Sequence, residues 1–170
     1  MNKSDTTQIV PLIKQLGERD GLVRQQARID LVRIGEPAVG SLIEALEKRT
    51  GYTHWEAAKA LSQIGSPQAA KALVEALEDD EFSVRWLAAE GLIAIGEDSL
   101  KPLLTALLDN PQSARLREGA HHILHDLIHR FVLEQELREQ VESVLVALND
   151  IEPAVEVPPV AKQALHRLPA

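Results

Sequence analysis

Four histidines fall within one short segment and are the side chains best suited to chemistry: His121, His122, His125 and His129. On a helix, the i, i+4 spacing of His121 with His125, and of His125 with His129, places two imidazoles on one face within reach of one metal ion. Glu118 lies one turn earlier and could supply a third ligand. The alternative is a solvated helix face whose charge changes near neutral pH.

No other set of side chains predicts catalysis. The chain has no cysteine, which excludes thiolate nucleophiles and thiolate metal sites. It also has no recognisable Ser/His/Asp set, phosphate-binding glycine-rich loop or carboxylate pair. We therefore expect a non-catalytic protein without a cofactor, in which the metal site at His121, His125 and His129 is only a secondary candidate.

The histidines lie in a chain that is organised by a repeated sequence pattern. Its skeleton recurs at a spacing of about thirty residues, which is typical of stacked repeat arrays. The three copies are Val23, Arg24, Ala27, Leu31, Ile34 and Gly35; Thr53, His54, Ala57, Leu61, Ile64 and Gly65; and Val84, Arg85, Ala88, Leu92, Ile95 and Gly96.

A second apolar stripe precedes each copy, with the i, i+3, i+4, i+7 spacing of an amphipathic helix. We name these first helices A helices and the helices of the repeated pattern B helices. Proline falls near the A-helix starts and glycine just past the B-helix ends, as expected for helix boundaries. The A stripes are Ile9, Leu12, Ile13, Leu16; Val39, Leu42, Ile43, Leu46; Ala70, Leu73, Val74, Leu77; Leu100, Leu103, Leu104, Leu107; and Val141, Val144, Leu145, Leu148.

The fourth B helix allows two frames. Aligning Arg115 with Arg85 would bury His122 and His125, whereas sliding the frame by two residues buries no histidine. We adopt the second frame, which places Arg117 in the arginine column and the following residues in the core: Leu116, Ala120, Leu124 and Leu127.

The end of the chain also allows two interpretations. Its proline content is typical of a disordered tail. The spacing of Val157, Ala161, Leu165 and Leu168 instead matches the B-helix core. We predict a short fifth B helix, paired with the A helix around Val141–Leu148, that caps the stack.

Composition and charge limit the function classes. Hydrophobic residues make up 45% of the chain and aromatic residues only 3%, which favours packed helices over a β-sandwich. A net charge of −8 with an acidic run at residues 78–81 disfavours nucleic-acid binding. No signal-type or membrane-spanning apolar segment is present, so we expect no membrane partner and a cytoplasmic location.

The repeated pattern resembles HEAT repeats, and specifically the short phycobilisome-lyase-type HEAT-like repeats. The resemblance is best carried by Asp80, Val84, Arg85, Ala88, Ala89, Leu92, Ile95 and Gly96. It implies an all-α fold, a right-handed α-solenoid of about five helical hairpins in one domain over residues 1–170. The expected repeats are about 8–35, 37–65, 67–96, 98–130 and 133–168, the last a degenerate cap. The resemblance also implies that the Asp and Arg residues form a structural hydrogen-bonded ladder between neighbouring repeats.

The B-helix face opposite the core is the predicted binding surface, since that side lines the concave face of HEAT-like stacks. Both tryptophans, Trp55 and Trp86, fall in one column of this face, and we expect both to be largely exposed. Clustered exposed apolar and aromatic side chains mark interaction sites. The other predicted surface residues are Ile29, Val32, Lys59, Glu90, Ile93, Glu118, His122 and His125.

The leading functional hypothesis is a non-catalytic scaffold that binds a protein partner on this face, as a monomer or weak homodimer. The alternative reading of the two tryptophans is that they complete the core. By resemblance, a second function is a lyase-type subunit that binds a bilin, an open-chain tetrapyrrole. A third is metal binding through the histidine helix 118–129. The iron-dependent hydroxylases of this repeat family bind iron through His-Glu dipeptides on their B helices. This chain has His54-Trp55-Glu56 and Arg117-Glu118 instead, which argues against iron chemistry.

Overall fold

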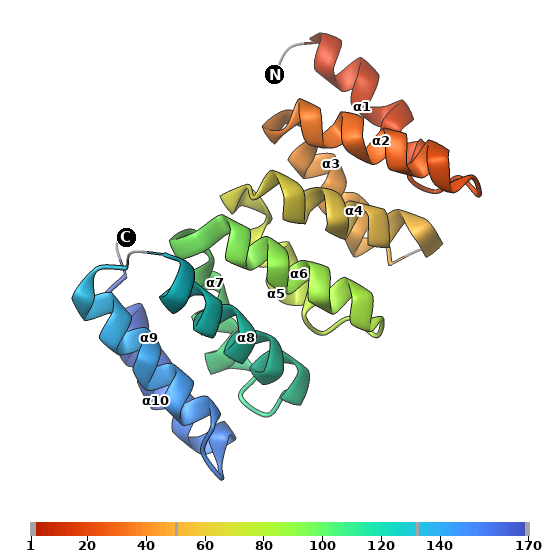
Figure 1. The fold of residues 1–170 in the computed structure, drawn as a ribbon. Coiled ribbons are helices and arrows are strands. Elements are labelled where there is room, and N and C mark those ends of the chain that lie inside the picture. The colour runs from red at the N-terminus through yellow and green to blue at the C-terminus, as the bar shows by residue number, and fades with distance from the viewer. Residues whose placement is uncertain (1–2, 50, 132, 169–170) are drawn as a thin grey trace.

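The computed structural model describes residues 3–49, 51–131 and 133–168, and over these residues the regular structure is helical. The helices follow one another as hairpins along a curved stack (Figure 1). Their bounds are α1 (Lys3–Gln15), α2 (Gly21–Ile34), α3 (Glu36–Glu47), α4 (Gly51–Ile64), η1 (Pro67–Ala69), α5 (Ala70–Ala76), α6 (Phe82–Ile95), η2 (Gly96–Ser99), α7 (Leu100–Asp109), α8 (Ala114–Arg130), α9 (Gln135–Leu148) and α10 (Pro153–Leu165).

The first four hairpins form two layers, as the repeat pattern predicts. The A layer contains α1, α3, α5 and α7, and the B layer contains α2, α4, α6 and α8, each helix packing on the next member of its own layer. The core lies between the layers and is built from small and aliphatic side chains. Alanine recurs at its centre, where Ala27, Ala57 and Ala88 are all 0% exposed and let the helices approach closely. The all-α solenoid is confirmed.

The frame adopted for the fourth B helix is also confirmed. Leu116 is 2% exposed, and Ala120, Leu124 and Leu127 are 0% exposed. His122 is half-buried at the edge of the core, and His125 is exposed.

Glycine turns connect each of the first three B helices to the next A helix. Gly35, Gly65 and Gly96 have φ values of +72°, +65° and +77°. For Gly35 and Gly96 the ψ values are −135° and −138°, a region of backbone space that side chains with a Cβ avoid. The glycine spacing therefore sets the crossing from the B layer back to the A layer.

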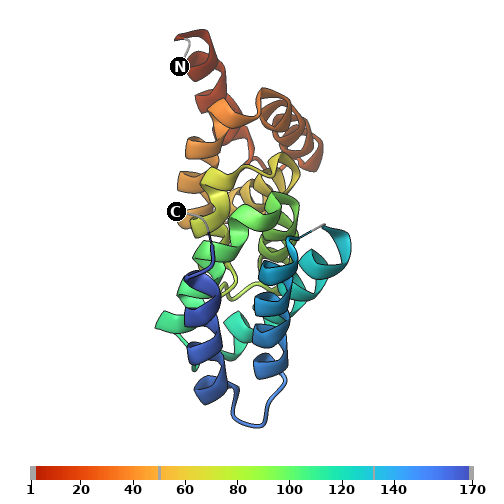
Figure 2. The same cartoon turned by 90° about the vertical axis from the view of Figure 1, so that its left-hand side faces the viewer.

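In the last hairpin the order of the two layers is reversed, so that the first helix lies in the B layer and the second in the A layer. The helix α9 packs on α8, and α10 packs on α7, so α9 extends the B layer and α10 the A layer. Figure 2 views the stack from its side and shows the two blue helices, α9 and α10, continuing opposite rows. The assignment of residues 135–148 to an A helix and of the terminal helix to the B layer was therefore wrong.

A missing glycine turn accompanies this reversal. Phe131 follows α8 where the earlier B helices have glycine, and its backbone is extended, with φ −115° and ψ 149°. An extended residue cannot make the tight left-handed turn into the A layer, so the chain returns beside α8 as an antiparallel neighbour. The reversed order of the last hairpin therefore coincides with the connection after α8, which among the described residues has no glycine turn.

The apolar pattern of the last hairpin was predicted better than its order. The chain is helical over Pro153–Leu165, which rules out the disordered-tail interpretation for that range. Val157 and Ala161 are 0% exposed, as predicted, whereas Leu165 and Leu168 are only half-buried. Ala164 takes the inner position instead, at 0% exposed. Among the described residues, no helix combines the length and apolar character needed to cross a membrane.

Replacing Gly96 by alanine tests the turn. An alanine at position 96 would have to keep the positive φ of Gly96, which residues with a Cβ disfavour, and its Cβ would lie 3.2 Å from Cε1 of Phe131. We therefore expect a loss of about 1–3 kcal/mol in the free energy of unfolding. Gly40→Ala is the matched control, because a Cβ at this helical glycine meets nothing within 4 Å. Alanine there is expected to stabilise by about 0.5–1 kcal/mol. Urea unfolding followed by circular dichroism would measure both, and equal effects would contradict the proposed role of the turn.

Candidate functional site

Trp86 is an exposed aromatic side chain on the outer face of the B layer, the face that points away from the core. It lies in the second turn of α6, and 48% of its surface is exposed. Its position two residues before the core residue Ala88 turns it away from the A layer. The prediction that Trp86 faces solvent is therefore confirmed.

The neighbouring repeat holds Trp86 in place. Its indole stacks on the imidazole of His122 from α8, with ring centroids 5.0 Å apart and an interplanar angle of 24°. The Nε2 atom of His122 lies 3.4 Å from Oε1 of Glu90, one turn further along α6. These three predicted surface residues thus form one cluster across the α6–α8 contact, in which the indole is preoriented before any partner arrives.

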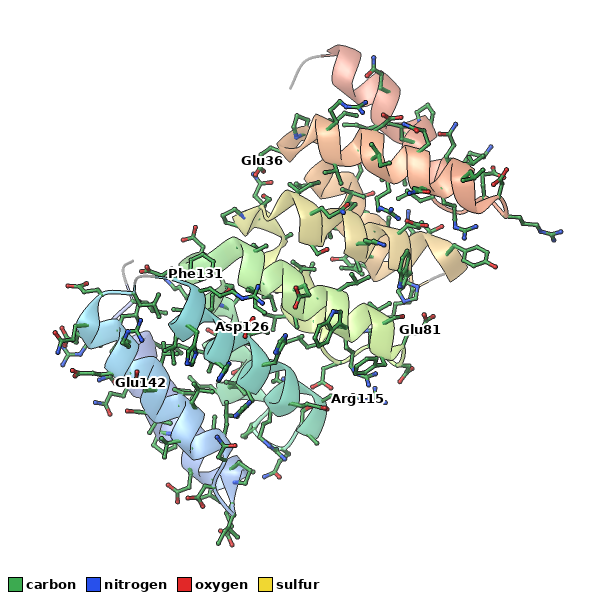
Figure 3. All side chains as sticks on the ribbon, in the orientation of Figure 1. Glu36, Glu81, Arg115, Asp126, Phe131 and Glu142 are labelled. Carbon is green, nitrogen blue, oxygen red and sulfur yellow. The ribbon has the colours of Figure 1, made fainter. Side chains whose placement is uncertain are left out.

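A hollow of about 160 Å³ lies beside Trp86, between the first turns of α6 and α8. Its apolar wall combines side chains of both helices with one from the end of the third A helix. Figure 3 shows Glu81 and Arg115 at the edge of the stack where these two helices begin. The residues that line the hollow are Leu77, Phe82, Arg85, Trp86, Ala89, Arg115, Glu118, Gly119 and His122.

Trp55 differs from the prediction. It is half-buried and packs against the core rather than standing free in solvent. The ammonium of Lys59 lies 4.8 Å from the centroid of its ring and covers part of the remaining indole. Trp55 therefore contributes to the packing of the core, and the expectation that both tryptophans are largely exposed was wrong for Trp55.

The exposure of the apolar surface residues also differs. Ile93 is only 3% exposed, so its assignment to the open surface was wrong. It lines a second hollow, of about 350 Å³, together with Phe131, the residue that follows α8. In the first repeat, Ile29 is 39% exposed and Val32 is half-buried, both two B helices away from the Trp86 cluster.

The histidine helix does not gather metal ligands. The rings of His125 and His129 stack on each other with centroids 4.3 Å apart, and His129 Nδ1 lies 2.7 Å from the backbone oxygen of His125. His121 turns instead toward α9, where its Nε2 lies 3.1 Å from the side-chain nitrogen of Asn149. Among the described residues, no group of three or more His, Asp or Glu side chains could hold a metal ion.

The arginine column has a structural role. Arg24, Arg85 and Arg117 each donate from Nη1 to backbone oxygens five or six residues earlier, in the loop between the A and B helices. Each arginine therefore fastens the loop of its own repeat, and Arg24 also donates from Nε to Glu56 of the second repeat, a bond between repeats of the kind that the resemblance implied. A second bond between repeats forms at Asp80, whose Oδ1 lies 3.0 Å from Nη1 of Arg115 in the next B helix.

The second repeat has His54 in the arginine column and uses it differently. His54 is 3% exposed, and its Nδ1 lies 3.1 Å from the backbone oxygen of Gly51. Its Nε2 faces the next repeat, 3.6 Å from Oδ1 of the buried Asp79. The departure from the repeat pattern therefore marks a polar contact between the second and third repeats.

Sequence reasoning missed a buried ionic cluster between the first two repeats. Glu56 is 4% exposed and accepts hydrogen bonds from Arg28, which is 8% exposed, and from Arg24 at 3.3 Å. The available signal was that Arg28 directly follows the core alanine, where the next two repeats have Ala58 and Ala89. A charged side chain at a position that is otherwise alanine requires a partner from a neighbouring helix.

The comparisons with known proteins agree with this architecture. A family model described as HEAT repeats matches residues 9–92 and 41–124, which together cover more than half of the 170 residues. An engineered protein of known crystal structure is 20% identical to this chain, with a TM-score of 0.50 over 96% of this chain and 78% of its own. At this identity the likeness supports the fold alone. No curated protein matches the chain. On the family match and the repeated two-layer hairpins, the chain belongs to the HEAT-repeat family.

Proposed function

We propose that this protein is a non-catalytic scaffold that binds a partner protein on the outer face of its B layer, centred on Trp86. HEAT repeats generally serve as protein-interaction scaffolds. The observation that carries the proposal is a half-exposed tryptophan, oriented by His122 and bordering an apolar hollow. Tryptophan is enriched among residues that dominate binding energy, particularly next to a pocket.

The test is the single substitution Trp86→Ala. We expect at least about a 30-fold weaker partner affinity, since a hot-spot truncation costs 2 kcal/mol or more, and nearly unchanged helicity. The partner would first be captured from the native lysate with the unaltered chain, and its affinity then measured by isothermal titration calorimetry.

Val155→Ala is the matched control, because Val155 is 60% exposed but lies on α10 in the A layer. It should leave the affinity unchanged. Equal affinities of the Trp86→Ala chain and the unaltered chain would contradict the proposal. Trp55→Ala is a poorer probe than the sequence suggested, because Trp55 packs on the core and its loss would also lower stability.

The finer sequence predictions are not tested by the geometry of the described residues. The lyase-type subfamily, a bilin ligand, a cytoplasmic location and a monomeric or weakly dimeric state therefore stay predictions. The geometry of the described residues adds no support for a bilin or a metal ion as the ligand, which is why the proposal is limited to a protein partner.

A further inference from the structure

The hollow beside Trp86 has a charged end as well as an apolar one. Arg85 and Arg115, from adjacent B helices, both line it. Both are fastened through Nη1 to the same short loop: Arg85 donates to the backbone oxygen of Asp79 at 2.8 Å, and Arg115 to that of Glu78 at 3.1 Å. The loop thus holds two guanidinium groups at one edge of the apolar wall.

Each guanidinium has donors to spare. Arginine carries five N–H donors on three nitrogens. The hydrogen bonds of Arg85 and Arg115 within the described part of the chain all use Nη1, and the Arg85 guanidinium also lies over the Phe82 ring, 5.5 Å from its centroid, so Nη2 and Nε still have N–H donors for a ligand. Two cationic groups that are already oriented and still have free donors suit a carboxylate, to which arginine can bind in a bidentate manner.

The loop that holds the two arginines is itself acidic, but its Asp79 and Glu81 side chains face His54 of the second repeat, 3.6 Å and 4.0 Å from its Nε2, and do not line the hollow. Asp80, which pairs with Arg115, has a side chain that is 90% exposed, and Glu118, about one turn after Arg115 on α8, is also exposed. Water and salt screen exposed charges more strongly than partly buried ones. The half-buried Arg85 therefore dominates at the base of the hollow, in a chain whose net charge is otherwise −8.

Resting on the proposed function, we infer that this hollow binds the carboxy-terminal residue of the partner protein, with its apolar side chain against Trp86 and its terminal carboxylate on Arg85 and Arg115. The hollow, at about 160 Å³, takes a single side chain. In a terminal residue the side chain and the carboxylate share one Cα, so both reach one small site. In an extended segment, an acidic residue next to the apolar anchor would point to the opposite side.

The inference can be tested with tetrapeptides and the full chain carrying Trp55→Phe, which leaves Trp86 as the single indole. The probes are acetyl-Gly-Gly-Gly-Leu as the free acid, the same peptide as its carboxy-terminal amide, and acetyl-Gly-Gly-Gly-Ser as the free acid. The readout is the NMR shift of the Trp86 indole N–H as each peptide is titrated. We expect the leucine acid to bind at least about tenfold more tightly than the other two, because the amide loses a charge-assisted contact and the serine acid loses the apolar burial against Trp86.

Variants assign the preference to the named charges. Arg115→Gln should lower the ratio of acid to amide affinity, because one of the two guanidinium groups is lost, whereas Glu118→Gln should raise the affinity for the acid. Arg33→Gln is the matched control, because Arg33 is an exposed arginine on α2, far along the B layer. It should leave the acid-to-amide ratio unchanged.

Equal affinity for the acid and the amide, or no saturable shift of the Trp86 signal with the leucine acid, would overturn the inference. Neither result would touch the proposed function, which is decided by the effect of Trp86→Ala on the captured partner. A partner that binds through Trp86 but needs no free carboxy terminus would refute this inference alone.

Discussion

The variant Glu56→Ala is expected to lose about 3–5 kcal/mol of the free energy of unfolding, the usual cost of removing one member of a buried ion pair. The side chain of Glu56 is 5% exposed and those of its partners Arg28 and Arg24 are 9% and 16% exposed. Without the carboxylate, two guanidinium groups remain between the first two repeats with no opposite charge and little water. Urea unfolding at neutral pH would measure the loss.

Two comparisons separate this effect from a general cost of losing a glutamate. Glu142→Ala removes a carboxylate that is 51% exposed and 3.9 Å from Arg138, and should change stability by less than about 0.5 kcal/mol. The double variant Glu56→Leu with Arg28→Met should be more stable than Glu56→Ala, since apolar replacement of a whole buried pair is often neutral. If Glu56→Ala is as mild as Glu142→Ala, the cluster contributes nothing to the repeat contact.

Leu92→Ala is expected to cost about 2–5 kcal/mol, the range measured for emptying a packed leucine position. Leu92 is 0% exposed in the third B helix, in the same column as Leu31 and Leu61, so the repeats on either side limit how far the cavity can collapse. For a chain of this length, each kcal/mol lowers the melting temperature by about 2–4 °C. Differential scanning calorimetry would record the shift.

The control for this cavity is the same substitution at an exposed leucine. Leu22 is 76% exposed in the first turn of α2, so Leu22→Ala should stay within about 0.5 kcal/mol of the unaltered chain. A similar loss for both variants would mean that the leucine column is not the packing centre of the array.

Much of the fold was predictable because the same core positions recur in the sequence of every repeat of a stacked array. The columns of Ala27 and Leu31 recur at nearly constant spacing, and the frame for Leu116 followed from avoiding buried histidines. Helical periodicity also placed Trp86 on the outer face. In each of these cases the determining contacts lie within one hairpin or between adjacent repeats of the same design.

The misses arise where that regularity ends. An apolar stripe shows which face of a helix is buried, but it does not show in which layer the helix lies, so the reversed order of α9 and α10 was not visible. Ile93 is 3% exposed although the helical periodicity places it on the outer face. The pairing of Arg28 with Glu56 depends on two side chains 28 positions apart meeting between helices, which a single sequence does not report.

The reversed hairpin also limits how such an array can grow. In the first three repeats, a B helix, its glycine and the following A helix recur in one register, so copying such a unit adds a repeat that its neighbours can accept. A copy placed after α10 would meet α9 in the B row, running antiparallel to the other B helices, and would find no matching surface. Gene duplication, or a designer who wants a longer scaffold, can therefore add such repeats upstream of Phe131, where each new unit meets neighbours of the same register.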